Sequence, residues 1–137
     1  MTPADIIAAA RSCLGTPFAH QGRIKGIALD CAGLAVCVAH DLGVEYIDQQ
    51  GYSREPISGL LHGALIKQPC LERTWKDQMQ PGDILLMRFG RDPQHLAIYT
   101  GQTIIHSYET VGIACEHDLT DVWRRRIVAV YRFKGIA

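Results

Sequence analysis

The sequence lacks an excess of charge of either sign, because 14 basic side chains balance 14 acidic ones. The densest basic cluster is the triplet Arg124-Arg125-Arg126, which we interpret as the solvated end of a short helix. Proteins that bind nucleic acids usually present a much stronger positive surface than this one. We therefore expect no nucleic-acid partner.

Paired cysteines and long apolar segments are also missing. The 5 cysteines form an odd set without a CxxC pair, which is typical of a reduced protein rather than a secreted disulfide framework. No apolar run approaches the length that crosses a bilayer, and the first residues lack the basic and apolar regions of a secretory signal. We expect a protein that is made in the cytoplasm and does not insert into a membrane.

What the sequence does have is enough apolar material for one domain over residues 1–137, since 47% of its residues are hydrophobic. The first half shows helical spacing, and the second half shows short apolar runs separated by turn residues, the pattern of an antiparallel sheet. The prediction is an α+β fold. The predicted helices cover residues 3–14, 32–42, 57–67 and 119–125, and the predicted strands cover residues 84–89, 95–100, 103–108, 113–117 and 127–133.

Two stretches have less regular patterns. Residues 16–29 contain two glycines and a proline among polar residues, and we predict a long loop that leads into the helix at 32–42. Residues 70–80 are polar and ambiguous, with Trp75 as their expected anchor. His40 and His62 are expected at the surface, and Cys13, Cys37 and Cys70 are expected to be packing residues.

Cys31 is the candidate nucleophile. Asp30 is the predicted N-cap of the helix at 32–42, which places Cys31 in the first turn, where the helix dipole favours a thiolate. The alternative is inert packing, because cysteine is among the most buried residue types. A histidine arrangement that converges on this sulfur would favour the catalytic interpretation.

Such an arrangement is predicted in a hairpin that turns at Gly101-Gln102. The turn would pair Tyr99 with Ile104 and Ala97 with His106, so that His95 and His106 lie on one face as diagonal neighbours. His95 could then accept the thiol proton while His106 orients His95. A register slip of one residue would separate them, and two ordinary surface histidines remain an alternative.

A zinc site is the competing chemistry for these histidines. Its possible ligands are His95, His106, Cys115 and His117. However, Cys-x-His is not a usual zinc-ligand spacing, and we predict neither a metal nor another cofactor.

Four segments in order resemble the NlpC-type cell-wall peptidase family, which has a papain-like fold. They are LDCAGL at residues 29–34, QPGDIL at 80–85, HLAIY at 95–99 and IIH at 104–106. The similarity is strongest to a compact branch encoded with phage tails, which shares GTPF at 15–18 and the segments WRRRI at 123–127 and YRF at 131–133.

The resemblance implies that the helix bearing Cys31 packs on a five- to six-stranded antiparallel sheet. It assigns Cys31 as nucleophile, His95 as general base and His106 as the orienting third member. The Cys31 backbone amide would stabilise the oxyanion, and Asp30 and Gly33 would contribute to the oxyanion and substrate-binding region.

Two positions depart from the family pattern. Ala32 stands where the family often has serine, which is a mild change. Many members also carry a tyrosine before the cysteine whose hydroxyl shapes the oxyanion site, whereas Phe18 stands near that place here. We hypothesise that His20 supplies the missing donor.

The resemblance also implies a function. Family enzymes cleave amide bonds in peptidoglycan stem peptides, typically between D-glutamate and a diamino acid. We expect a cysteine endopeptidase that is carried by a phage tail or phage-like particle, has tail-tip proteins as partners and acts at the cell wall. The alternative is a catalytically silent structural or assembly component of a tail tip.

Overall fold

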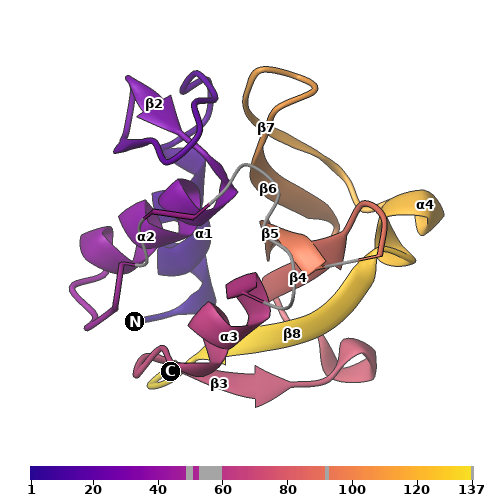
Figure 1. Cartoon of the computed structure of the whole chain (residues 1–137). Helices are drawn as coiled ribbons and strands as arrows, with labels where there is room; N and C mark the ends of the chain where they lie inside the picture. Colours follow the sequence, from indigo (N-terminus) through magenta and orange to yellow (C-terminus); the bar gives the residue numbers. More distant parts are fainter. Residues whose placement is uncertain (49–50, 53–59, 92, 137) are drawn as a thin grey trace.

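A computed structural model of the chain describes residues 1–48, 51–52, 60–91 and 93–136. Figure 1 shows α1 and α2 together on one side of a curved sheet, with α4 near the far edge of that sheet. The described helices are α1 (Pro3–Arg11), α2 (Cys31–Asp41), α3 (Leu60–Ile66), α4 (Asp121–Arg124) and a 3-10 turn over Lys76–Gln78. The described strands are β1 (Arg23–Ile24), β2 (Ala28–Leu29), β3 (Leu71–Thr74), β4 (Ile84–Arg88), β5 (Pro93–Tyr99), β6 (Thr103–Tyr108), β7 (Ile113–Asp118) and β8 (Ile127–Phe133).

The main sheet is antiparallel and has six strands in the order β3-β8-β4-β5-β6-β7. The five strands predicted in the second half of the sequence are confirmed. The sixth, β3, forms in the stretch 70–80, where the sequence was ambiguous. The segment 16–29, predicted as a loop because of its glycines, contains a second, two-stranded sheet made of β1 and β2.

The first helix begins as predicted and ends early. Thr2 caps α1, because its side chain accepts a hydrogen bond from the Asp5 amide while the Asp5 carboxylate accepts one from the Thr2 amide. The helix stops at Arg11, and Leu14, which was predicted to extend its apolar face, is 41% exposed. Among the described residues, no helix has the length and apolar character needed to cross a bilayer.

The second helix positions the cysteine. Leu34 and Val38 of α2 are buried in the core, and the helix packs against α1, β5 and β6. Its N-terminal turn approaches a neighbouring loop closely at Gly33, where an added Cβ would lie 2.0 Å from the Gly22 carbonyl oxygen. Glycine is therefore required at this contact.

Side chains of the sheet are buried on both of its faces. One core lies between the sheet and the helices and includes Leu96 and Ile105, whereas Ala97 and Ile104 belong to a second core on the other face. Alternate residues of a strand point to the same face, so His95 lies on the same face as Ala97, and His106 on the same face as Ile104.

The predictions for the third helix, for Trp75 and for two histidines have different outcomes. The predicted helix at 57–67 is found as α3, although its expected first turn lies outside the described residues. Trp75 is not an anchor, because 58% of its surface is exposed. His62, predicted at the surface, is partly exposed and its Nε2 lies 2.9 Å from the Tyr131 hydroxyl, whereas His40 is exposed as predicted.

Candidate active site

Cys31 is the first residue of α2, as the sequence predicts. Asp30 caps the helix in an extended conformation, and its carboxylate accepts a 2.7 Å hydrogen bond from the Gly33 amide. Asp30 has only 5% of its surface exposed. The cap therefore fixes the direction in which the Cys31 side chain leaves the helix.

Asp30 is also the centre of a polar network that the sequence did not reveal. Its carboxylate accepts hydrogen bonds from Arg23 Nη1 at 2.9 Å, from the Gln21 amide at 2.9 Å and from the Tyr52 hydroxyl. Arg23 also donates to Asp48 and to the Tyr52 oxygen. No local pattern marks Tyr52, since it reaches Asp30 from another segment of the chain.

The surroundings of Cys31 disfavour a resting thiolate. Burial, followed by the nearby Asp30 charge, raises the pKa of the Cys31 thiol to about 12, although the backbone amides of Leu96 and Ala32 act in the opposite direction. Burial thus outweighs these two backbone amides, so the thiolate that the helix N-terminus was expected to favour is disfavoured in the resting protein. The thiolate must form as its proton leaves for a base.

Cys31 lies in a pocket of about 600 Å³. The lining residues that come from α2 and α3 are mostly apolar, whereas those from the sheet and the loops include aromatic and basic side chains. Side chains of interest in the lining are Phe18, His20, Asp30, Tyr52, Phe89, His95, Tyr108 and Arg126. The candidate nucleophile and the candidate base therefore face the same space.

His95 and His106 meet as predicted. Nε2 of His95 lies 2.6 Å from Nδ1 of His106, and both side chains are buried. The ladder between β5 and β6 includes the predicted pair of Tyr99 with Ile104 but not Ala97 with His106. The strands part before that point, and among the described residues Nδ1 of His95 has no hydrogen-bond partner.

Gly101 makes this hairpin possible. Its φ of 110° lies in the region that favours glycine, and the amide of Thr100 donates to the Thr103 carbonyl at 3.0 Å. On the helix side, the Ser107 hydroxyl donates to the Leu29 carbonyl at 2.6 Å. This bond joins β6 to the residue before Asp30 and so connects the two sides of the site.

The two histidines are held neutral. Burial lowers the pKa of His95 well below the usual value, with smaller effects of His106, Arg126 and His117. Burial and the neighbouring His117 lower the pKa of His106 to about 3. An unprotonated His95 is the form that can accept a proton from a thiol.

Aromatic rings surround the histidine pair. Tyr108 stacks on His106 with a centroid separation of 5.3 Å, and Trp123 meets His106 edge-on at 5.1 Å. Arg126 lies over Trp123 at 4.4 Å and over Phe89 at 5.2 Å and is partly buried, whereas Arg124 and Arg125 are exposed, as expected for a solvated helix end. The contact with Phe89 could not be foreseen because the two residues are distant in sequence.

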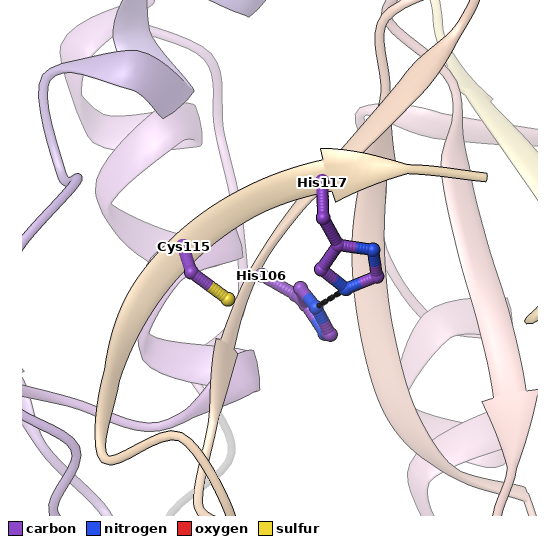
Figure 2. Close-up of side chains that lie close together, drawn as sticks. All are labelled: His106, Cys115 and His117. Carbon is purple, nitrogen blue, oxygen red and sulfur yellow. Dashed lines mark hydrogen bonds between the residues drawn. The ribbon is translucent and has the colours of Figure 1, made fainter.

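Three of the four residues proposed as zinc ligands lie together. Donor atoms of His106, Cys115 and His117 are all within 4.8 Å of one another, and Figure 2 shows the two β7 side chains directed toward His106. His95 does not belong to this group. Nε2 of His106 and Nε2 of His117 are 2.8 Å apart, a hydrogen-bond distance, whereas two nitrogens on one tetrahedral zinc stand about 3.3 Å apart.

The remaining predicted residues have different surroundings. Phe18 and His20 line the pocket, but Nε2 of His20 lies 3.0 Å from the Tyr52 carbonyl oxygen. The same nitrogen lies 3.3 Å from Nε2 of Gln21, an amide nitrogen that can only donate, so these contacts do not fix the tautomer of His20 and its role as the oxyanion donor stays a prediction. Gly33 is not among the pocket-lining residues and serves the close packing against Gly22.

Residues 15–132 match the NlpC/P60 family. No curated protein matches the chain by sequence. Among solved structures, the chain resembles an NlpC/P60 family protein from Bacillus cereus with a TM-score of 0.71 and 21% identity, over 97% of this chain and 40% of that protein.

Two mycobacterial structures are also similar. The peptidoglycan hydrolase RipB from Mycobacterium tuberculosis has a TM-score of 0.68 and 16% identity over 98% of this chain and 65% of its own. RipD from the same organism, described as a non-catalytic NlpC/p60 domain protein adapted to peptidoglycan binding, has a TM-score of 0.64 and 16% identity over 96% of each chain. The fold is that of the papain-like NlpC/P60 domains, and the chain spans less than two thirds of the B. cereus protein and of RipB.

Proposed function

The chain belongs to the NlpC/P60 family, and we propose that it is a cysteine peptidase that hydrolyses an amide bond in the stem peptides of peptidoglycan. The observation that carries this proposal is the 2.6 Å hydrogen bond between His95 and His106 beside the pocket lined by Cys31. Fold alone would not carry it, because RipD shares the fold and is described as non-catalytic.

The reaction would be acyl transfer. Sγ of Cys31 attacks the substrate carbonyl carbon while its proton passes to Nδ1 of His95, and the Cys31 amide stabilises the oxyanion at the N-terminus of α2. The C–N bond then breaks as His95 returns this proton to the leaving amine. Water next attacks the thioester and gives a proton to His95, which passes it back to the departing sulfur.

The neutral resting pair suits this sequence of steps. Both the raised pKa of Cys31 and the lowered pKa of His95 keep the proton on sulfur until substrate arrives. Proton transfer to His95 is then coupled to attack, so His95 acts as a general base instead of the partner of a permanent ion pair.

We further propose the bond between D-glutamate and a diamino acid as the one cleaved, and a phage or phage-like tail as the assembly that carries the protein to the cell wall. The support is the similarity of residues 15–18 and 123–133 to the tail-associated branch of the family. Under this proposal the protein is made in the cytoplasm, and tail-tip proteins position it during genome entry.

The test is digestion of purified sacculi, followed by mass spectrometry of the released muropeptides. Wild-type protein should release fragments that end at D-glutamate, and Cys31→Ala should release none. Cys115→Ala is a matched control, because Cys115 is also partly exposed but lies outside the pocket lining. Intact sacculi with the wild-type protein would leave only a binding or assembly role, and equal release by Cys31→Ala would show that Cys31 is not the nucleophile.

A further inference from the structure

Beyond His106, the row of imidazoles continues to a third histidine on the next strand. Nε2 of His106 lies 2.8 Å from Nε2 of His117, and Nδ1 of His117 lies 3.0 Å from the backbone carbonyl oxygen of Asp118. Figure 2 shows the first of these bonds between the β6 and β7 side chains. The row therefore runs from the pocket to a fixed backbone group.

That carbonyl sets the direction of every hydrogen bond in the row. A carbonyl oxygen only accepts, so Nδ1 of His117 carries the proton and Nε2 of neutral His117 is an acceptor. His106 must then donate from Nε2 and accept at Nδ1, and His95 must donate from Nε2. The consequence is that Nδ1 of His95, the nitrogen without a described partner, holds a free lone pair.

The surroundings keep this order intact. Burial and His117 keep the pKa of His106 near 3, so a second proton does not enter the row there. Trp123 covers the row, with its ring 5.1 Å from the rings of both His106 and His117. The titratable or charged groups that face the row are Tyr108, Cys115 and Arg126.

We propose that His117 is a positioning residue, which fixes the tautomers of His106 and His95 so that Nδ1 of His95 is ready to accept the thiol proton. This inference rests on the proposed peptidase function, since it assigns a purpose to the free nitrogen of His95. His117 itself is not among the residues that line the pocket.

The tautomers can be measured on the full chain without any substrate. Two-bond 1H–15N couplings of 15N-labelled protein distinguish a proton on Nδ1 from one on Nε2. Wild-type protein should show the proton on Nε2 in His95 and His106 and on Nδ1 in His117. A proton on Nδ1 of His106 in the wild-type protein would overturn the proposal.

Two substitutions separate positioning from simple packing. In His117→Gln the amide oxygen can still accept from His106, so the tautomers should be retained, whereas His117→Ala should give a mixture in His106 and His95. The kcat on sacculus fragments should fall roughly 10- to 100-fold in His117→Ala, with KM unchanged, and should recover to within about threefold of wild type in His117→Gln. Unchanged tautomers or unchanged kcat in His117→Ala would refute the role.

Two controls complete the experiment. Cys115→Ala, on the same face of β7, should keep the wild-type tautomers and kcat. Treatment of wild-type protein with EDTA should leave the histidine signals in place, and a shift of the His106 and His117 signals would mean that a metal ion replaces the proton between them, which would overturn the proposal. If the tautomers are as expected but sacculi stay intact, the peptidase function fails while the tautomer order stands.

Discussion

The nucleophile side of the pocket and its histidine side are held by different kinds of interaction. On the nucleophile side, charged groups surround the helix cap, where Asp30 pairs with Arg23 at 2.9 Å. On the histidine side, neutral imidazoles form a hydrogen-bonded row beneath aromatic rings. The comparison suggests that charge fixes where the sulfur points, whereas proton placement determines whether the base can accept.

The largest loss of stability is expected when the charged interactions at the helix cap are removed. Asp30→Ala removes the helix cap and one of the two carboxylates that pair with Arg23, at a site where the Asp30 and Arg23 side chains are only 7% and 15% exposed. The free energy of unfolding in urea should fall by about 3–5 kcal/mol. Asp41→Ala is the matched control, because Asp41 pairs with Lys25 at 34% and 35% exposure and should lose less than about 1 kcal/mol. Equal losses of unfolding free energy in the two variants would show that the Asp30 pair stabilises the fold no more than an exposed ion pair does.

A smaller loss is expected when the packing on the same side is changed. Gly33→Ala places a Cβ 2.0 Å from the Gly22 carbonyl oxygen, so the loop must move away from α2. The expected cost is about 1–3 kcal/mol in thermal or urea unfolding. Gly63→Ala in α3 is the control, since nothing lies within 4 Å of the added atom, and it should stabilise the helix slightly. The interpretation fails if both variants behave alike.

The third prediction concerns the histidine side and the pH dependence of stability that His106 causes. The pKa of His106 is lowered to about 3 by burial and by His117, whereas an unfolded histidine titrates near ~6.5. Between these two pKa values the unfolded chain binds more protons than the folded chain. The contribution of His106 to the free energy of unfolding is therefore fully present above pH ~6.5 and is lost as the pH falls. From pH 7 to pH 5 this histidine should lower the free energy of unfolding by about 2 kcal/mol.

Comparison with His106→Gln isolates the contribution of the histidine row, because groups away from that row titrate alike in both proteins. The wild-type protein should lose about 2 kcal/mol more than the variant over the same pH interval. Parallel pH profiles for the two proteins would mean that His106 is not held neutral by the fold.

Local signals in the sequence predicted the elements that carry the chemistry. Asp30 before an apolar helix and Gly101-Gln102 between two apolar runs were sufficient to place Cys31, His95 and His106 correctly on their elements. The family resemblance added their proposed roles. These predictions succeeded because a helix cap and a two-residue turn depend on neighbours only a few residues away.

Other features required the folded chain. The Tyr52 contact to Asp30, the Arg126 contact to Phe89 and the bond from His106 to His117 each join separate segments of the chain. The raised pKa of Cys31 was not foreseen for the same reason, because it comes mainly from burial by distant segments.

By itself, then, the sequence determined where the helix begins, where the hairpin turns and which three side chains are candidates for the reaction. Only the tertiary structure decided that the thiol rests neutral and that His117 extends the histidine row. The physical reason is range: capping and turn formation act between near neighbours in the chain, whereas desolvation and proton order depend on everything that packs around a group.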